Sequence, residues 1–179
     1  MIKVVNIKGL NVFPIFKNGQ TSIVRHARRH NSNWLINEQC GRAEPITVFL
    51  RRPRERFVSG VHSYIEFEKR KNEDLDVEKT LLDIRDGKIV NEHFIPQYQW
   101  LKDLASYYNG ILNIKTVNDL RSLIDEREEP SIPLITRQRH EAILCMEYDL
   151  KQDEILFNRY VSSRLPIGKL LREVDNALS

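Results

Sequence analysis

Two short segments of the chain combine cations, hydroxyls and glycine in the way that proteins bind phosphate-like anions. The first segment, residues 16–22 (FKNGQTS), follows an apolar β-branched run and precedes a helical pattern. A helix N-terminus offers unpaired N–H groups and the positive end of a dipole. Gly19 permits close approach of an anion to the backbone, and Lys17 adds a point charge. Thr21 and Ser22 add hydroxyl donors, although a simple turn followed by an N-cap would use the same residues.

The second segment, residues 50–60 (LRRPRERFVSG), also ends an apolar run and opens a helical pattern. Arg51 falls at the carboxyl end of the expected strand, where open α/β sheets bind ligands. Cations at a helix N-terminus oppose the dipole, so the arginines here require an anion or a carboxylate. Arg56 is open to two interpretations, an anion ligand or a brace paired with an acidic side chain. Ser59 could share a ligand with Arg51 only if the chain folds back near Pro53.

The strands and helices that position these two segments can be predicted from alternating apolar runs and helical patterns in the sequence. We expect strands within residues 4–16, with a break at Lys8 and Gly9, and over residues 46–50 and 111–117. We expect helices over residues 21–30, 53–70, 77–86, 117–125, 149–161 and 166–178, and irregular structure over 31–45 and 91–100. This alternation predicts a single α/β domain over residues 1–179, with a central, mainly parallel sheet flanked by helices.

Composition narrows the function classes. The 179 residues carry a formal net charge of only +3, which does not indicate a nucleic-acid coat or a polybasic membrane binder. Basic residues gather instead in short runs at 25–30, 51–56 and 137–140. Cys40 and Cys145 are too few for a disulfide framework or a four-ligand zinc site, and we expect reduced core thiols. No signal-peptide core and no stretch of ~20 apolar residues is present, so we expect a cytoplasmic protein without a membrane span.

A third segment, residues 91–98 (NEHFIPQY), completes a recognisable set. Lys17-x-Gly19-x-Thr21-Ser22, Arg51-x-Pro53-x-x-Arg56-x-x-Ser59-Gly60 and the His-aromatic-x-Pro-Gln pattern of the third segment occur in this order. Together they resemble the sulfotransferase superfamily that uses 3'-phosphoadenosine 5'-phosphosulfate (PAPS), and most closely its carbohydrate and heparan branch. The resemblance covers only the three segments. Position 18 is Asn, position 20 is Gln and position 52 is Arg, which depart from the residues usual in the family.

The resemblance implies a P-loop-like three-layer fold and PAPS as co-substrate, with no metal. The 5'-phosphosulfate would be held by Lys17, Asn18, Gly19, Gln20, Thr21 and Ser22. Arg51 and Ser59 would hold the 3'-phosphate, and Lys17 would stabilise the bridging oxygen as its bond to sulfur breaks. The acceptor would be a hydroxyl or an amine, and the branch favours a sugar.

An acceptor hydroxyl needs a general base. His93 is the first candidate, because it lies in the third segment and histidine titrates near neutrality. His62, three residues beyond Ser59, is the second, and Glu38 or Glu92 could serve as a carboxylate base. A structural histidine bonded to the backbone is the competing interpretation for His93.

Three other functions remain open at this stage. A P-loop-like kinase would use a Walker A loop, but the first segment has one glycine and its lysine comes before it. A non-catalytic anion- or RNA-binding module would bind with a steep dependence on salt and no nucleotide preference. A degenerate sulfotransferase would bind the nucleotide without transferring sulfate.

Overall fold

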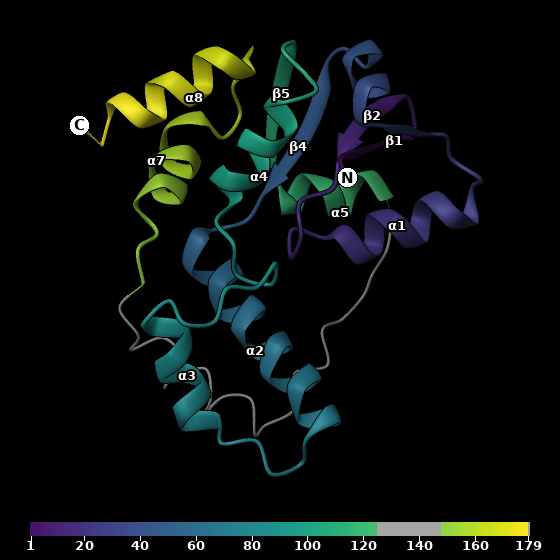
Figure 1. The fold of residues 1–179 in the computed structure, drawn as a ribbon. Helices are drawn as coiled ribbons and strands as arrows, with labels where there is room; N and C mark the ends of the chain where they lie inside the picture. The colour runs from purple at the N-terminus through teal and green to yellow at the C-terminus, as the bar shows by residue number, and fades with distance from the viewer. Residues whose placement is uncertain (125–147, 179) are drawn as a thin grey trace.

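The computed structural model describes residues 1–124 and 148–178 and has an α/β architecture (Figure 1). Six strands form one sheet in the order β3-β1-β2-β4-β5-β6. Their bounds are Lys3–Ile7 (β1), Leu10–Phe13 (β2), Trp34–Ile36 (β3), Ile46–Leu50 (β4), Ile111–Thr116 (β5) and Arg164–Pro166 (β6). Only the β2–β4 and β4–β5 pairs are parallel. The α/β class is confirmed, whereas the expected mainly parallel sheet is corrected to a mixed one.

The break at Lys8 and Gly9 explains the antiparallel part of the sheet. Both residues have positive φ, 48° and 84°, as in the two-residue type I′ turns that join hairpin strands. The chain therefore reverses between β1 and β2, and Val5 pairs with Val12. Strand β3 adds to β1, and β6 adds to β5, both antiparallel.

The helices match most of the expected ones to within a few residues. Their bounds are Gln20–Arg29 (α1), Pro53–Lys71 (α2), Val77–Arg85 (α3), Gln97–Ala105 (α4), Val117–Ile124 (α5), Lys151–Tyr160 (α7) and Ile167–Asn176 (α8). The expectation of irregular structure over residues 31–45 and 91–100 was wrong in part. Residues 34–42 form β3 and a 3-10 helix, Asn37–Arg42 (η1), and α4 begins inside the third segment.

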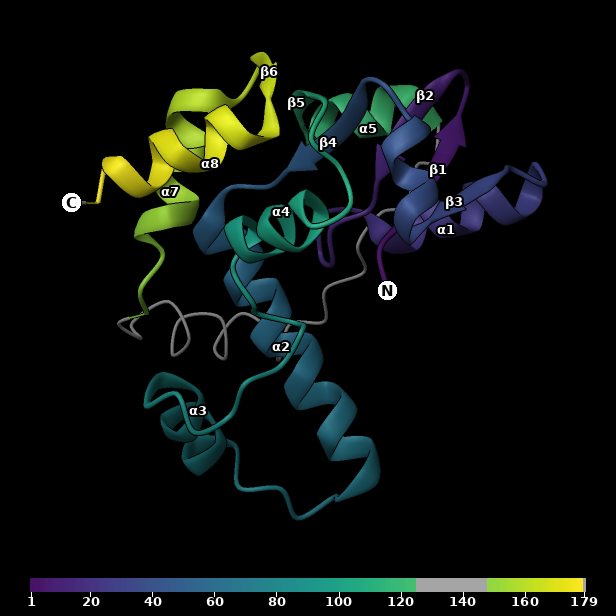
Figure 2. The same ribbon diagram turned by 45° about the horizontal axis from the view of Figure 1, so that its top comes forward.

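Helices cover both faces of the sheet. Successive side chains of a strand point to opposite faces, so Val48 and Leu50 of β4 belong to one apolar cluster and Phe49 to another. The first cluster includes residues of α4, α7 and α8, and the second includes residues of α1 and α5. Figure 2 shows α4, α7 and α8 together on one side of the sheet.

Helix α2 leads away from the end of β4 and carries a third apolar cluster. This cluster joins α2 to α3 and to the third segment through Val61, Ile84 and Phe94. Both ribbon views show α2 and α3 extending from the sheet (Figures 1 and 2). The third segment is therefore attached to α2 before it enters α4.

Candidate functional site

Three helices begin at one edge of the sheet. Strands β2, β4 and β5 are parallel neighbours, so their carboxyl ends meet at this edge. Residues 14–19 lead from β2 into α1, Arg51 and Arg52 lead from β4 into α2, and α5 follows β5 directly. The sheet thus brings the first and second segments to the place where open α/β sheets bind ligands.

The first segment forms a compact loop with two residues in the left-handed region. Lys17 has φ 64° and Gly19 has φ 81°, and the Asn18 N–H donates to the carbonyl of Ile15 at 3.1 Å. A Cβ at position 19 would lie 2.4 Å from Leu120 Cδ2 of α5. Glycine is therefore needed at this position both for its φ and for packing against α5, besides any approach by an anion.

Two of the three helix N-termini at this edge lack a side-chain cap. Gly19 and Arg52, which precede α1 and α2, make no side-chain cap hydrogen bond. At the start of α5, by contrast, the N–H and the hydroxyl of Thr116 both donate to Asp119 Oδ2 at 2.8 Å. The first turn of α1 contains no acidic residue and consists of Gln20, Thr21 and Ser22. The backbone N–H groups of a first helical turn have no partner within the helix, which suits an anion.

A buried amide network joins the first segment to the second. The Asn18 side chain, 1% exposed, donates to the carbonyl of Phe49 at 2.8 Å and to Gln97 Oε1 at 2.5 Å. Gln97 also accepts from the Arg51 N–H and donates to the Arg51 carbonyl, each at 3.0 Å. Asn18 thus has its amide donor turned into the interior, and its role in this structure is to hold the loop.

Asp153 of α7 holds the other end of this network. Its two carboxylate oxygens accept the N–H groups of Gln97 and Tyr98 at 2.8 Å, at the start of α4. Burial raises the pKa of Asp153, and these two donors and the Arg56 charge oppose that rise. Gln97 and Asp153 lie 56 residues apart in sequence. No local pattern links the two residues, so this contact could not be predicted from the sequence.

Lys17 and Arg51 form the accessible part of a cation cluster. Both are half-buried. The pKa of Lys17 is lowered by burial and then by the charges of Arg51 and Arg56. Burial also lowers the pKa of Arg51, with Arg121 of α5 adding to this effect and Glu55, 3.8 Å away, opposing it. Cations that lie close together at a partly buried site repel one another, so binding an anion between them is favourable.

Arg56 is buried and binds the backbone of the first segment, whereas the brace expected from the sequence was a pair with an acidic side chain. Its side chain is 1% exposed, and its Nε–H donates to the carbonyl of Phe16 at 3.1 Å. Burial lowers its pKa to about 10, while the charge of Asp153 opposes the fall. The Nη2 group is buried with no hydrogen-bond partner in the described part of the chain. Arg56 therefore fixes the backbone just before Lys17 and adds positive charge behind it.

His93 lies next to the first segment. Its ring makes an edge contact with Phe16, with 4.8 Å between the ring centroids. Burial and then the charge of Lys17 lower the pKa of His93, and Glu92 opposes this. Its Nδ1 lies 2.5 Å from Asn91 Oδ1. The third segment thus brings a histidine that is biased toward its neutral form to the cation cluster.

Ser59 and His62 are both half-buried on α2. Ser59 is six residues beyond Pro53, about 9 Å further along the helix axis. The adjacent Gly60 packs directly on the third segment, since a Cβ there would lie 1.9 Å from the His93 carbonyl oxygen. The residue that follows Ser59 thus lies against the third segment.

The other candidate bases lie apart from the cluster or at its margin. Glu38 is exposed on η1, which follows the edge strand β3. Glu92 is exposed beside His93 and acts on it only through its charge. Cys40 belongs to the core, as expected, and so does Tyr98. Cys145 and the basic run 137–140 lie outside the described residues.

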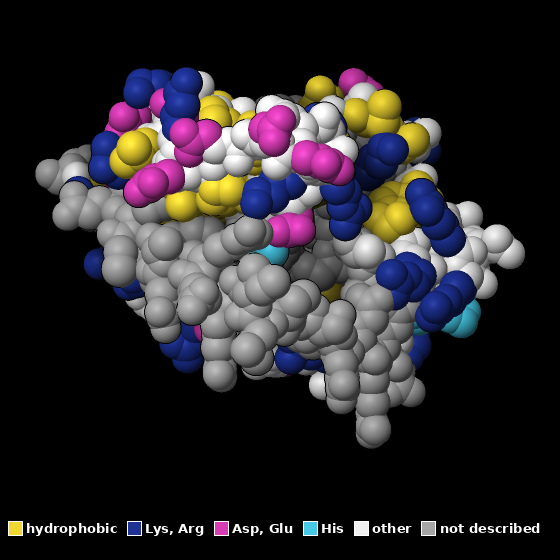
Figure 3. All heavy atoms as spheres, turned by 90° about the horizontal axis from the view of Figure 1, so that it is seen from below, with side chains coloured by type: hydrophobic (Ala, Val, Ile, Leu, Met, Phe, Trp, Pro, Cys, Tyr) yellow, Lys and Arg dark blue, Asp and Glu magenta, His cyan; other side chains and the backbone are white. Residues whose placement is uncertain are grey.

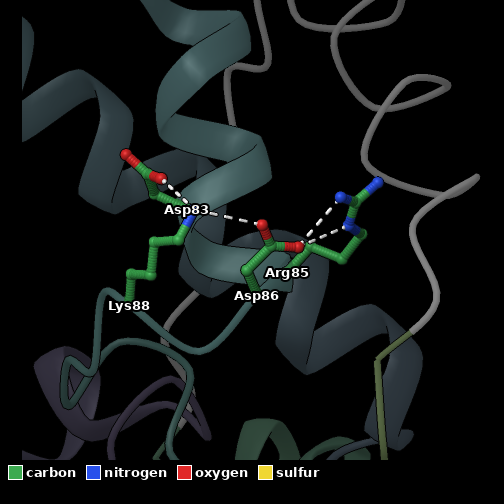
Figure 4. Close-up of polar contacts among 4 residues, drawn as sticks. All are labelled: Asp83, Arg85, Asp86 and Lys88. Atoms are coloured by element: carbon green, nitrogen blue, oxygen red, sulfur yellow. Dashed lines mark hydrogen bonds and ion pairs between the residues drawn. The ribbon is translucent and has the colours of Figure 1, made fainter.

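Oppositely charged side chains form a surface cluster away from the sheet edge. On α3 and the turn after it, Lys88 contacts Asp83 and Asp86 at 3.2 Å, and Arg85 contacts Asp86 at 2.9 Å (Figure 4). Seen from below, Lys and Arg side chains alternate with Asp and Glu over the upper left of the described surface, whereas Lys and Arg side chains gather beside a His on its right side (Figure 3). At the sheet edge, Lys17 lies within electrostatic reach of Arg51 and Arg56, and Glu55 contacts Arg51.

Comparison with protein-family models, with curated proteins and with solved structures finds no match to this chain. Within residues 1–124 and 148–178, no helix combines the length and apolar character that crossing a membrane requires. The same residues contain no group of three or more His, Cys, Asp or Glu side chains placed to hold a metal ion.

Proposed function

We propose that this chain is a sulfotransferase that binds PAPS across the ends of β2 and β4, in a P-loop-like arrangement, and transfers its sulfuryl group to an acceptor hydroxyl or amine. One observation carries the proposal. Lys17 and Arg51 lie in the connections that follow the adjacent parallel strands β2 and β4, and hydrogen bonds of Gln97 with Asn18 and with Arg51 join these two connections. A ligand with two separated anionic groups, such as this nucleotide, can neutralise both segments at once.

The chemistry follows from the residues at this edge. Sulfuryl transfer resembles phosphoryl transfer, in which positioning and fixed positive charge supply most of the catalysis. The acceptor oxygen attacks sulfur with a lone pair while His93 Nε2 takes the proton of the hydroxyl. The bond from sulfur to the bridging oxygen breaks, and its electron pair stays on the 5'-phosphate. Lys17 stabilises that developing charge, and 3'-phosphoadenosine 5'-phosphate (PAP) leaves.

Calorimetric titration with PAP, AMP, ATP and ATP with Mg²⁺ tests the donor site. We expect metal-free binding of PAP that depends on its 3'-phosphate, and a loss of at least tenfold in affinity for Arg51→Ala, since a charge-assisted contact contributes about 1.5–3 kcal/mol. Arg85→Ala is the matched control, because it removes the same side chain from the surface cluster of α3.

The titration also separates the alternatives. Preference for ATP with Mg²⁺ would favour the kinase. Equal binding of PAP and AMP, with a steep salt dependence, would favour an anion- or RNA-binding module. Tight PAP binding without sulfate transfer to any of a panel of sugar, phenol and amine acceptors would favour a degenerate sulfotransferase. The first two outcomes overturn the proposal.

A further inference from the structure

We propose that Asn91 is a positioning residue that sets the tautomer and the ring orientation of His93, so that Nε2 is the nitrogen that accepts a proton. This inference rests on the proposed function for its catalytic meaning. The contact itself can be tested without any nucleotide. It concerns a residue at the start of the third segment to which the resemblance assigns no role.

The atom of Asn91 that faces the His93 ring is its amide oxygen. The backbone N–H of His93 donates to Asn91 Oδ1 at 3.1 Å, which requires an oxygen at that position. The same oxygen lies 2.5 Å from His93 Nδ1. An amide oxygen only accepts, so Nδ1 must carry the hydrogen of this contact. In the neutral ring, Nε2 is then the unprotonated nitrogen and the only basic one.

Contacts from two other elements hold the ring and its backbone in place. Helix α2 lies against the His93 carbonyl at Gly60, where no side chain would fit. Phe16 makes its edge contact from the first segment, and Tyr64 of α2 lies with its ring centroid 6.3 Å from that of His93. The ring therefore has one hydrogen-bonded edge toward Asn91, and its other edge must point elsewhere.

The charged and titratable groups around His93 come from each of these elements. Lys17 of the first segment disfavours the imidazolium, Glu92 of the third segment favours it, and Tyr64 faces the ring from α2. Lys17 acts from the same side on which the sulfuryl group is proposed to lie. A histidine held as the Nδ1–H tautomer beside this lysine is ready to accept a proton, because its one free lone pair is on Nε2.

Nitrogen-15 NMR of histidine-labelled protein without ligand tests the contact directly. The wild type should show His93 as the Nδ1–H tautomer, with its signals assigned by their loss in His93→Gln. In Asn91→Ala the Nε2–H tautomer should become the major form, because it is the commoner one when no partner selects between them. Asn91→Asp should keep the Nδ1–H tautomer and raise the pKa of His93, since a carboxylate replaces the amide.

Asn11→Ala is the matched control. It removes an amide from an exposed Asn pair on the β1–β2 hairpin and should leave the His93 signals unchanged. Urea unfolding verifies that each variant is folded. An Nε2–H tautomer in the wild type, or an unchanged tautomer in Asn91→Ala, overturns the inference.

Kinetics then connect the contact to the reaction. Asn91→Ala should lower kcat about tenfold or more while the PAP affinity stays within about twofold, because general-base catalysis contributes about 10²–10⁴-fold and only part depends on orientation. Asn91→Asp should restore much of kcat at a higher pH. If PAP does not bind at all, the proposed function fails while the NMR result for Asn91 still stands.

Discussion

Arg51 and Arg56 belong to one short basic run but differ in their solvent exposure. Arg51 is half-buried at the sheet edge, whereas Arg56 is buried with a hydrogen bond to the backbone of the first segment. The sequence indicated that both needed an anionic partner. Burial separates their roles, because only Arg51 remains accessible to a ligand.

Replacing these two arginines should therefore have different effects on stability. Arg56→Ala should lower the free energy of unfolding by about 1–3 kcal/mol, because it removes the hydrogen bond to the Phe16 carbonyl and leaves that acceptor without its partner. Arg51→Ala should change it by no more than about 0.5 kcal/mol, as for an ordinary surface site. Urea unfolding measures both, and equal losses would contradict the structural role assigned to Arg56.

The pH dependence of stability should report the environment of His93. Its pKa in the folded chain lies below the ordinary value of 6.5. Between the pKa of His93 in the folded chain and 6.5, the unfolded chain binds more protons than the folded chain. The free energy of unfolding therefore rises with pH through this window and falls on acidification. The free energy of unfolding, measured on either side of pH 6.5, should fall less steeply with acid in His93→Gln than in the wild type. An identical slope would mean that burial and Lys17 do not depress this pKa.

At the residue scale, local patterns in the sequence selected three residues whose functional roles stay predictions. Lys17, Arg51 and His93 stand beside strand ends or in recognisable segments, and the structure places them near one another. Gln97 belongs to the His-aromatic-x-Pro-Gln pattern of the third segment. Its hydrogen bonds with Asn18 and with Arg51, however, join three separate parts of the chain. Asp153 had no local signature at all. Arg121 could have been suspected, because it lies on the short helix that directly follows the third parallel strand.

The packing of α2 on the third segment depends on the absence of a side chain at position 60. A Cβ there would lie 1.9 Å from the carbonyl oxygen of His93 and 2.7 Å from its carbonyl carbon. Backbone atoms cannot rotate away as a side chain can. Gly60→Ala should therefore force α2 and the third segment apart and lower the free energy of unfolding by about 1–3 kcal/mol, as overpacked cores do.

Gly168→Ala is the control for this prediction. Gly168 also lies in a helix, α8, but a Cβ there would lie 3.7 Å from the flexible end of Arg172. Alanine should be tolerated at that site, with a gain of up to about 1 kcal/mol from helix propensity. Thermal unfolding of both variants measures the difference. A stable Gly60→Ala variant would show that the close contact is not a constraint on the fold.

Helices and strands with a clear hydrophobic pattern of their own could be predicted from the sequence. Short elements, and elements that depend on contacts with distant parts of the chain, could not. The continuous apolar run of β4 and the helical spacing of α2 identified both elements. Helix α4 was missed because its start is stabilised from outside, by Asp153 of α7 accepting its first N–H groups. Strands β3 and β6 span only three residues each and follow from pairing with β1 and β5 rather than from a local pattern.

At the scale of the whole molecule, the main error of the sequence-based prediction was the direction of the strands. Alternating strands and helices led to the expectation of a mainly parallel sheet, but three of the five strand pairs are antiparallel. The two parallel pairs, β2–β4 and β4–β5, form the centre of the sheet. The correction therefore affects the edges and leaves the carboxyl ends of the central strands together, where the cation cluster lies.

Because Gln97 ties both segments to α4 and Asp153 ties α4 to α7, an anion at the sheet edge should stabilise the whole chain rather than one loop. PAP at about 100 times its dissociation constant should add about 2.7 kcal/mol of stability. For a chain of this length, that corresponds to a rise in Tm of about 5–11 °C. AMP at the same concentration and ionic strength should have a much smaller effect, and Arg51→Ala should largely remove the response to PAP.

The variant Gln97→Leu tests, in the same Tm measurement, whether the hydrogen bonds between the two segments contribute to the stabilisation by PAP or whether the cations alone account for it. Leucine has similar volume but cannot bridge Asn18 and the Arg51 backbone, so the variant should start from a lower Tm and respond less to PAP. Arg51 keeps its side chain in this variant, which means that a weaker response must come from the position of the two segments. A full PAP response in Gln97→Leu would show that the segments hold their anion-binding geometry without the network, and that the cations alone determine affinity.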